Sequence, residues 1–338
     1  MSARLVLAAD VGGTKTNLAL VAATARGTIG DAAATATYRS ADFPSLEAMI
    51  DVFRGERAAS IPGPVAAASI GFAGPIAGGR GEGSNVPWSV DAASLARHLG
   101  LSRVGLVNDL VATGYGVAAL RPEQLAPLLS GTAASDANAA ILAAGTGLGE
   151  TILARIDGEF VPIASEGGHA DYAPRSDLEL KIWQALRARH GRVSLERVLS
   201  GPGLVNVAGV IHVQAGAEAA WRAHEREAGG TETLPGTISR NGLERSCPAC
   251  TDALDLFAGI YGSEAGNLAL RCVARGGVYL GGGIAPRILP ALRSAAFERA
   301  FRDKEPHRAL LSEIPVWVLL DDRTALWGAA RHASFALP

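Results

Sequence analysis

Two short glycine-rich segments of this chain have residue types that could bind phosphate. They are Asp10-Val-Gly-Gly-Thr14 and Gly145-Thr-Gly-Leu-Gly149, and each lies between two apolar runs. This pattern predicts a strand, a tight turn and a second strand. Backbone N–H groups in such turns converge on phosphate oxygens. Two ordinary β-hairpins would give the same pattern, but the repetition, with Thr14 and Thr16 near one turn and Thr146 in the other, favours a two-sided phosphate clamp.

Neither segment matches a common nucleotide-binding fingerprint. The chain has no G-x-x-x-x-G-K-[ST] sequence, so a Walker A loop is excluded. Gly145-Thr-Gly-Leu-Gly149 leads into a predicted strand, whereas the dinucleotide fingerprint leads into a helix. The pattern therefore argues against a Rossmann oxidoreductase.

Two carboxylates lie directly beyond predicted strands. Asp10 ends the apolar run 5–9, where it could hold a Mg²⁺ ion through water close to bound phosphates. An Asx turn that shapes the hairpin is the alternative for this residue. Asn108 and Asp109 follow the run 104–107. Because ligands bind beyond the carboxyl ends of strands in open α/β sheets, Asp109 is placed to act as a general base on a hydroxyl group. Its alternative role is to cap a helix.

Three further segments could contact a polar ligand. Glu166-Gly-Gly-His169 places a carboxylate and an imidazole around two glycines, so it could divide several hydroxyl groups between acceptor and donor roles. A solvated surface turn is the alternative. Glu196, beside Arg197, is by its position alone a surface charge. Gly281-Gly-Gly283 follows a predicted strand and permits either a flat group such as adenosine or close packing of a helix on the strand.

The rest of the chain alternates strands with helices, which predicts an α/β class. Ser45 is expected to cap one helix, and Ser176-Asp-Leu-Glu179 is a capping box that opens another. Ser200-Gly-Pro-Gly203 is expected to end a short helix over 194–199. Residues 121–138 are expected to cross between domains, and residues 214–243 form a polar, partly helical insertion. Buried strands are predicted over 18–21, 65–72, 104–107, 139–144, 151–154, 278–280 and 316–320, and further helices over 45–53, over 94–99, from 176 to near 191, and from 324 onward.

Composition excludes several classes of protein. The chain has 338 residues, which predicts about two domains. Its formal net charge of −2 gives no excess of positive charge that would indicate binding to nucleic acid or to an anionic membrane. Its content of 48% hydrophobic residues excludes a disordered chain. The apolar run near Met1 is too short for a signal peptide, and prolines interrupt the uncharged stretch 58–79. We therefore expect a soluble, cytoplasmic protein.

The order of the motifs resembles that of a known family. Leu7-Ala-Ala-Asp-Val-Gly-Gly-Thr14 is similar to the first phosphate motif of the actin, hexokinase and heat-shock-protein-70 superfamily of ATP-binding proteins. Motifs that follow in the order and spacing of the bacterial glucokinase family are Leu106-Val-Asn-Asp109, Ala144-Gly-Thr-Gly-Leu-Gly149, Glu166-Gly-Gly-His169, Ser194-Leu-Glu-Arg-Val-Leu-Ser-Gly-Pro-Gly-Leu204 and Gly281-Gly-Gly-Ile-Ala-Pro-Arg287. The match runs nearly end to end, and Glu-Arg-Val-Leu-Ser-Gly-Pro-Gly is specific.

This resemblance implies a role for each motif residue. Asp109 is the expected catalytic base, which takes the proton from the 6-hydroxyl of the sugar. The expected sugar-binding residues are Asn85, Asn108, Asp109, Glu166, His169 and Glu196. The expected ATP-binding residues are Asp10, Gly12, Gly13, Thr14, Gly145, Thr146, Gly147, Gly281, Gly282 and Gly283. No protein atom is expected to coordinate Mg²⁺ directly. Asp10 is expected to contact the ion through a water molecule.

The resemblance also implies the fold and the reaction. We expect a two-domain actin-like ATPase (ribonuclease H-like) fold with an interdomain active-site cleft, in which residues 1–118 and 322–338 form a small α/β domain and residues 119–321 a large one. The implied enzyme is a glucokinase, which forms glucose 6-phosphate from glucose and ATP with Mg²⁺ and is a homodimer. A kinase for mannose, N-acetylglucosamine or another hexose is the first alternative, and an ATPase of the actin or chaperone type is the second.

Two departures from related proteins stand out. The insertion 214–243 aligns poorly with the family, so it receives no role. The chain also lacks the Cys-x-Cys-Gly zinc cluster of the related repressor, open-reading-frame and kinase group. Its cysteines are Cys247, Cys250 and Cys272, and one C-x-x-C with a distant third cysteine is a weak signal for zinc. A pair of free thiols is the expected outcome.

Overall fold

The chain folds into two compact units. The computed structural model describes residues 4–57, 63–83, 86, 88–228 and 233–337. The first unit comprises residues 1–124, 159–164 and 321–338, and the second comprises residues 125–158 and 165–320. None of the helices in these described ranges is both long and apolar enough to cross a bilayer.

The first unit is built on a five-stranded mixed sheet with the spatial order β3-β2-β1-β4-β8. The first three strands pair antiparallel, whereas β4 and β8 continue the sheet in parallel with β1. The predicted hairpin is confirmed, with Asp10 of β1 opposite Asn17 of β2. The strands are β1 (Arg4–Val11), β2 (Lys15–Ala25), β3 (Thr28–Arg39), β4 (Val65–Phe72) and β8 (Gly105–Asn108), and a small second sheet contains β5 (Ile76–Ala77), β6 (Arg80–Gly81) and β7 (Val90–Asp91).

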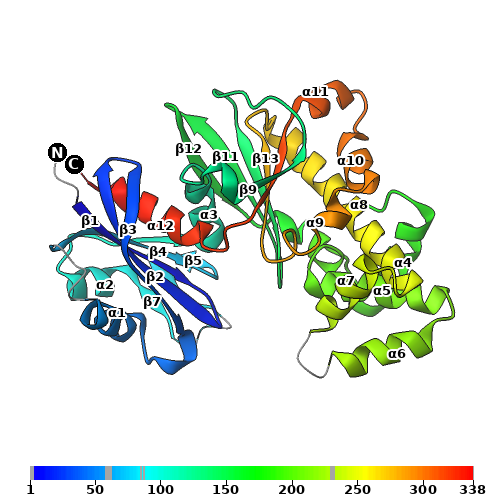
Figure 1. Cartoon of the computed structure of the whole chain (residues 1–338), viewed down its shortest axis with the longest axis horizontal. Helices are drawn as coiled ribbons and strands as arrows, with labels where there is room; N and C mark the ends of the chain where they lie inside the picture. Colours follow the sequence, from blue (N-terminus) through cyan, green and yellow to red (C-terminus); the bar gives the residue numbers. More distant parts are fainter. Residues whose placement is uncertain (1–3, 58–62, 84–85, 87, 229–232, 338) are drawn as a thin grey trace. The chain divides into compact units, whose positions relative to one another are not determined.

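Helices cover both faces of this sheet. Alternate residues of β1 enter two different cores, since Leu7 packs with Met49 of α1 on one face and Val6 packs with Leu326 of α12 on the other. Figure 1 shows α12 lying along one side of these strands. The N-cap predicted at Ser45 is confirmed, because its side chain accepts a hydrogen bond from the N–H of Ala48. The helices of the unit are α1 (Leu46–Glu56), α2 (Ala92–Leu99), α3 (Asp109–Val117) and α12 (Thr324–Ser334), with 3₁₀ turns η1 (Ser40–Asp42) and η3 (Pro122–Gln124).

The second unit contains five strands of the second mixed sheet, in the order β11-β10-β13-β14-β9. Its second glycine-rich segment also forms the predicted hairpin, because β10 pairs antiparallel with β11 and Ala144 lies opposite Leu148. β13 and β14 then continue in parallel. The strands are β9 (Leu125–Leu129), β10 (Ala139–Ala144), β11 (Leu148–Ile156), β13 (Val278–Gly281) and β14 (Val316–Leu319), and β12 (Glu159–Ser165) follows β11 along the chain.

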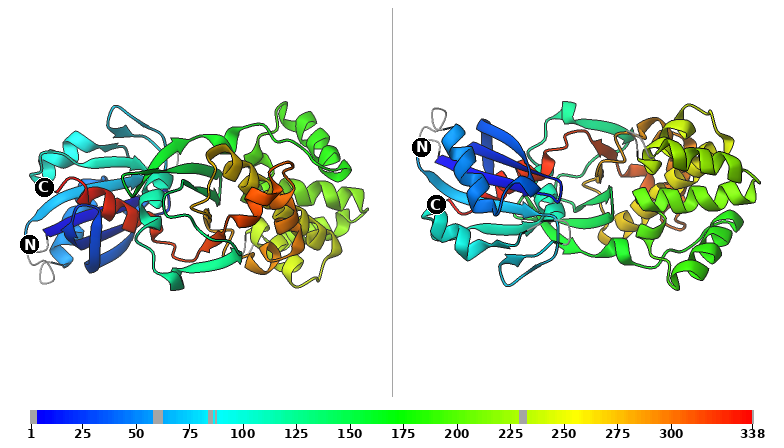
Figure 2. Two further views of the ribbon diagram at one scale, coloured as in Figure 1. Left: turned by 90° about the horizontal axis from the view of Figure 1, so that it is seen from above. Right: turned by 90° about the horizontal axis from the view of Figure 1, so that it is seen from below.

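The helices of the second unit gather around the long helix α8. Figure 2 shows this group at one end of the unit, drawn in green, yellow and orange. α8 is buried along most of its length, and its Phe257 and Tyr261 lie in the core with Phe297 of α10. The helices are α4 (Asp177–His190), α5 (Gly201–Gln214), α6 (Glu218–Glu227), α7 (Leu234–Leu243), α8 (Pro248–Cys272), α9 (Leu289–Leu292), α10 (Ala295–Arg302) and α11 (Arg308–Glu313), with 3₁₀ turns η4 (Gly167–His169) and η5 (Leu195–Arg197).

One prediction about the elements of this unit is wrong, and another is incomplete. Ser200-Gly-Pro-Gly203 does not end a helix but begins α5, because Ser200 accepts a hydrogen bond from the N–H of Gly203 and Pro202 lies in the first turn. The segment before it forms only η5. The predicted crossing over residues 121–138 does contain a boundary between the units, between Gln124 and Leu125, but it also contains β9, which pairs antiparallel with β14.

Candidate active site

The first glycine turn is held rigidly within the first unit. The N–H of Gly12 donates to the carbonyl of Lys15 across the hairpin, at 3.0 Å, and a Cβ atom at Gly12 would lie only 3.0 Å from that oxygen. The hydroxyl of Ser40 donates to the carbonyl of Gly12 at 2.7 Å, and its N–H donates to the carbonyl of Thr14 at 3.2 Å. Ser40 is fully buried and therefore positions the turn. No motif in the sequence marks Ser40, so sequence reasoning missed it.

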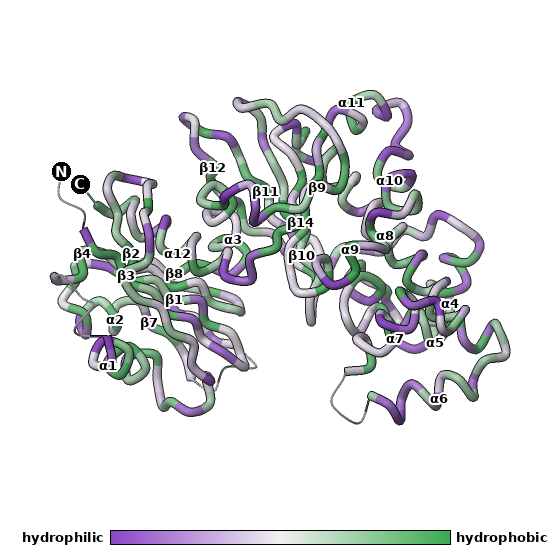
Figure 3. The backbone as a smooth tube through the Cα atoms, in the orientation of Figure 1, coloured by the Kyte–Doolittle hydropathy of each residue, from purple (hydrophilic) through white to green (hydrophobic). Residues whose placement is uncertain are grey.

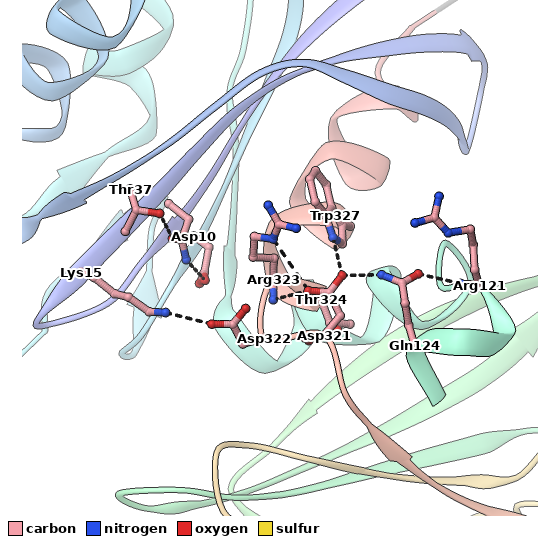
Figure 4. Close-up of polar contacts among 11 residues, drawn as sticks. Asp10, Lys15, Thr37, Arg121, Gln124, Asp321, Asp322, Arg323, Thr324 and Trp327 are labelled. Carbon is pink, nitrogen blue, oxygen red and sulfur yellow. Dashed lines mark hydrogen bonds and ion pairs between the residues drawn. The ribbon is translucent and has the colours of Figure 1, made fainter. Parts of the chain in front are cut away.

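Asp10 lies beside this turn with its carboxylate held by β2. The side-chain amide of Asn17 donates to Asp10 Oδ2 at 3.2 Å, and Thr37 in turn donates to Asn17 Oδ1 at 2.8 Å. Burial raises the pKa of Asp10 to about 6, the hydrogen bond from Asn17 opposes this rise, and the nearby Asp109 carboxylate adds to it. The carboxylate is thus bound by a side chain of β2, and these contacts do not form the Asx turn that was the alternative for Asp10. Figure 4 shows Lys15 paired with Asp322, and the two atoms lie 3.1 Å apart.

Asp109 lies at the first residue of α3, directly after β8. Asn108 is the N-cap of this helix, and its Oδ1 accepts from the N–H of Leu110 at 2.9 Å. Asp109 Oδ1 also accepts from Leu110, at 2.8 Å, and both polar side chains are half-buried. α3 is fixed against α12, since a Cβ atom at Gly328 would lie 1.7 Å from the carbonyl of Ala112. The position of Asp109 is therefore set by close helix packing.

The sheet brings Asp10 and Asp109 to the same edge. Asp10 of β1 is aligned with Gly71 of β4, and Gly71 is aligned with Val107 of β8. Both acids therefore lie at the carboxyl ends of parallel strands, Asp10 within the last two residues of β1 and Asp109 directly after β8. The residue aligned between them, Gly71, has no side chain. Carboxylates are hard oxygen donors, and a cation beside them would offset the repulsion between their charges. This donor set fits a magnesium ion.

The second glycine turn is held within the second unit by Glu196. The carboxylate of Glu196 accepts from the N–H of Leu148 at 3.0 Å, and a Cβ atom at Gly147 would lie 2.7 Å from its Oε2. The turn closes through the N–H of Gly145, which donates to the carbonyl of Gly147 at 2.8 Å. The space around Gly145 is open, and Thr146 is exposed. Glu196 is thus not the surface charge that its position in the sequence indicates.

Glu166 and His169 flank a glycine pair that lies directly on β11. A Cβ atom at Gly168 would lie 2.0 Å from the carbonyl of Leu148, and one at Gly167 would lie 2.2 Å from Glu150 Oε2. The side chains of Glu166 and His169 are exposed and approach each other to 4.0 Å. The N–H of Leu195 donates to the carbonyl of Ala170 at 2.9 Å, which ties this segment to η5. The structure therefore brings together Glu166, His169, Glu196 and the Gly145–Gly147 turn.

Glu150, beneath this segment, is a buried carboxylate with a second one beside it. Glu150 and Glu264 both lie against Arg271, with Nη1 at 3.2 Å and 2.7 Å from their respective oxygens. Burial raises the pKa of Glu150 well above its ordinary value, the charge of Glu264 raises it further, and Arg271 opposes both effects. The side chains of Glu150 and Glu264 are each only 2% exposed.

This arrangement predicts that stability falls as Glu150 ionises. Because the pKa of Glu150 is raised, the folded state keeps a proton at pH values where the unfolded state has lost it. The contribution of Glu150 to the free energy of unfolding is therefore greatest below the ordinary carboxyl pKa. That contribution is lost as the pH rises through the raised pKa. A pKa that differs by one between the folded and unfolded states changes the free energy of unfolding by about 1.4 kcal/mol. The Glu150→Gln variant is therefore expected to lose less stability than the parent protein between about pH 5 and pH 8 in denaturant unfolding. Glu298→Gln, at a half-exposed position, is the control, and equal pH dependence in Glu150→Gln and the parent would contradict the prediction.

The third glycine segment borders a pocket in the second unit. Gly282 has φ +77°, and a Cβ atom there would lie 2.2 Å from the carbonyl of Ala144, whereas Gly283 faces open space. The hydroxyl of buried Tyr261 donates to the carbonyls of Leu142 and Gly281, at 3.3 and 3.4 Å. The adjacent pocket has a volume of 540 Å³. Its walls include Leu204, Pro235, Ser239, Leu243, Ile284 and Ile288.

The chemistry of this pocket suits a flat heterocycle. About half of its wall residues are aliphatic, and its polar groups include the hydroxyl of Ser239, the guanidinium groups of Arg240 and Arg287, and the carboxylate of Glu244. Small-molecule sites typically combine such an apolar lining with a few polar groups. Among the predicted site residues, Asn85 lies outside the described residues. The other predicted site residues form two groups, one in the first unit and one in the second.

Comparison with known proteins identifies the family. The family model for glucokinase matches residues 7–335. A glucokinase of Synechocystis sp. is 37% identical over 347 residues, which cover 96% of each chain. The crystal structure of a glucokinase from an Antarctic psychrotroph superposes with a TM-score of 0.83 at 29% identity and covers 97% of this chain and 98% of that one.

A more distant structure extends the likeness of the fold. A ROK family glucokinase from Streptomyces griseus, solved in complex with glucose and AMPPNP, has a TM-score of 0.60 at 24% identity and covers 97% of this chain and 99% of that one. The predicted actin-like ATPase fold is thereby confirmed, as is the resemblance from which it was inferred. The chain belongs to the glucokinase family.

Proposed function

We propose that this protein transfers the γ-phosphoryl group of ATP to the 6-hydroxyl of glucose. The observation that carries the proposal is membership of the glucokinase family across residues 7–335. Two sets of residues suited to phosphate and hydroxyl groups support it, one in each unit. Phosphoryl transfer needs little covalent chemistry from the protein, so positioning and charge stabilisation are what these sets must supply.

In this proposal Asp109 is the catalytic base. Its carboxylate takes the proton from the 6-hydroxyl as that oxygen attacks the γ-phosphorus, and ADP leaves. Such a base must come within about 2.6–3.2 Å of the attacking oxygen. The N-terminal position on α3 supports the role, because the N–H of Leu110 holds the carboxylate at the carboxyl end of β8. Asn108 binds a neighbouring hydroxyl, as does Asn85.

The ATP is bound by backbone groups. The turns Gly12-Gly13-Thr14 and Gly145-Thr146-Gly147 donate N–H groups to its phosphates. The adenosine lies beside Gly281–Gly283, in the 540 Å³ pocket. Magnesium, held near Asp10, would neutralise charge on the phosphates. The raised pKa of Asp10 supports this placement, since a cation would stabilise the carboxylate form.

An assay with ATP and several different sugars is the experiment that tests which substrate the enzyme uses. Glucose is expected to support rapid ADP formation in a coupled assay, whereas mannose and N-acetylglucosamine support much less. The 2-position distinguishes these sugars, and a few hydrogen bonds decide such specificity. Preference for another hexose would select the first alternative. ATP hydrolysis that is independent of any sugar would instead indicate an ATPase of the actin or chaperone type.

Glu166 and His169 are expected to bind sugar hydroxyls together with Glu196. The Glu166→Gln and His169→Ala variants should raise KM for glucose by roughly tenfold or more, with a smaller change in KM for ATP, because a hydrogen bond to a charged group contributes about 1.5–3 kcal/mol. Steady-state kinetics with each substrate varied in turn measures both constants. Glu218→Gln, at an exposed position on α6, is the control. Equal effects on the two constants would assign the segment a structural role instead.

The resemblance also supports three coarser proposals. We propose that the enzyme works in the cytoplasm, where ATP and glucose are available, and as a homodimer. The two proposed catalytic domains are residues 1–118 with 322–338, and residues 119–321; they differ from the compact units at residues 119–124, 159–164 and 321. Sedimentation at several protein concentrations tests the dimer, since a single species with the mass of one chain would contradict it.

A further inference from the structure

Four metal-binding side chains meet inside the second unit, in a place that the phosphoryl-transfer site does not use. They are His212 of α5, His224 of α6, and Cys247 and Cys250 at the start of α8. One ligand atom from each lies within 4.8 Å of the other three. His212 and Cys250 are fully buried, and His224 and Cys247 are 8% and 9% exposed. The pattern C-x-x-C was a weak signal in the sequence because its two partner histidines lie far away along the chain.

The spacing of these atoms suits a tetrahedral ion. His212 Nε2 lies 3.6 Å from Cys247 Sγ and 3.8 Å from Cys250 Sγ, and His224 Nε2 lies 3.4 Å from Cys250 Sγ. Zinc binds sulfur at about 2.3 Å and imidazole nitrogen at about 2.0–2.1 Å, so tetrahedral geometry separates S and N ligands by about 3.5 Å. The three S–N distances in the cluster lie within a few tenths of an ångström of that separation.

The histidine rings are oriented by their second nitrogen atoms. His212 Nδ1 lies 2.7 Å from the carbonyl of Ala208, so it carries the proton and leaves Nε2 with a free lone pair. His224 Nδ1 lies 3.2 Å from the side-chain nitrogen of Asn241. With this amide turned by 180°, its oxygen would accept from an Nδ1–H group and leave Nε2 as the metal-binding nitrogen. The carbonyl partner of His212 Nδ1 is typical of a metal-bound histidine.

The two thiols are arranged by the N-terminus of α8. Cys247 is the N-cap, and its Sγ accepts from the N–H of Cys250 at 3.4 Å. Pro248 occupies the first turn, so the loop between the cysteines is short and fixed. A pair of buried neutral thiols could exist without a cation. However, the two Nε2 atoms and the two sulfur atoms converge on one buried point, where all four could bind a single cation.

Besides this cluster, α6 is held by the ion pair of Glu227 with Arg240 of α7 and by the packing of Trp221. His224 is its one buried residue, and no side chain caps its first turn. Figure 3 shows hydrophilic residues along this helix. Trp221 packs its ring against His212, with centroids 5.3 Å apart. Isolated helices shorter than about 12–15 residues are marginal in water, so a helix of 10 residues with this surface needs an anchor.

We propose that His212, His224, Cys247 and Cys250 bind one Zn²⁺ ion as a structural site that fastens α6 to α5 and α8. The set supplies four protein ligands and leaves no coordination position for substrate, which is the mark of a structural rather than a catalytic zinc site. Thiolate and imidazole ligands disfavour Mg²⁺, so the site is distinct from any ion that accompanies ATP. Binding displaces the two thiol protons to solvent. The site gives the insertion 214–243 a role.

Metal analysis of the whole chain tests this proposal directly. The protein, made in zinc-supplemented medium and purified without a polyhistidine tag, is expected to contain about one zinc ion per chain by plasma mass spectrometry. The Cys247→Ser, Cys250→Ser double variant should lose that ion. Cys272→Ser is the matched control, because this cysteine is buried on the same helix but lies outside the cluster. It should keep the ion.

A second measurement remains decisive if the double variant fails to fold. After exchange of the parent protein into cobalt(II), we expect the strong visible absorption of tetrahedral cobalt together with a thiolate-to-cobalt charge-transfer band. Zinc below about a tenth of an ion per chain in the parent protein would overturn the proposal. So would zinc that the double variant retains, or a cobalt spectrum without thiolate absorption.

Discussion

Replacing Asp109 with asparagine is expected to lower kcat for glucose phosphorylation by about 10²–10⁴-fold, since proton transfer to a positioned base typically contributes that much. Asparagine has the shape of aspartate and keeps an oxygen that can accept from the N–H of Leu110, as Asp109 does at 2.8 Å. The helix start and the sugar-binding groups should therefore survive. The Kd for glucose, measured by calorimetry, is expected to change little.

The control for this prediction is Asp51→Asn. Asp51 is an exposed carboxylate on α1 in the same unit, where it pairs with His98 at 2.8 Å, so the substitution makes the same change of charge away from the site. Its kcat should equal that of the parent enzyme. Near-normal turnover in Asp109→Asn, with the folded structure intact, would show that another group accepts the proton.

Replacing Gly282 with alanine is expected to prevent correct folding of the second unit. The residue has φ +77°, and left-handed backbone at a residue other than glycine costs about 1–3 kcal/mol. The new Cβ atom would in addition lie 2.2 Å from the carbonyl of Ala144, which belongs to the central strand β10 and cannot move freely. Together these effects consume a large part of the roughly 5–15 kcal/mol that stabilises a typical protein.

Gly283→Ala is a matched control for this second prediction. It makes the same chemical change one residue further on, where no atom lies within 4 Å of the added Cβ and φ is ordinary. Gly283→Ala should unfold at the temperature of the parent protein, whereas Gly282→Ala should be recovered in low yield or unfold at a far lower temperature. Comparable melting of the two variants would mean that the loop can rearrange at little cost.

Local signals in the sequence predicted much of the fold correctly. The two hairpins follow from short apolar runs on either side of glycine turns, and the strand over Ala139–Ala144 has the bounds predicted for it. The N-cap predicted at Ser176 is confirmed, because its hydroxyl accepts from the N–H of Glu179, whereas the Glu179 carboxylate accepts from the N–H of Arg175. These features depend on residues close together in the chain, which is why a single sequence reveals them.

Features that depend on distant partners were not predictable in this way. Glu196 looked like a surface charge because its partner, the N–H of Leu148, lies 48 residues away. Ser200 was mistaken for part of a helix terminator, since serine, glycine and proline also favour the first turn of a helix. β9 was missed because its pairing with β14 joins segments far apart in the chain. His212 and His224 gave no signal before the fold placed them beside two thiols.

The position of the phosphoryl group in the product is the sharpest test of the proposed reaction. Wild-type protein is incubated with ATP, Mg²⁺ and ¹³C-labelled glucose, and the product is examined by phosphorus and carbon NMR. We predict one sugar phosphate, with phosphorus coupled to carbon 6, formed in equal amount to ADP. Phosphate on any other carbon, or ADP accompanied by inorganic phosphate instead of a sugar phosphate, would contradict the proposal.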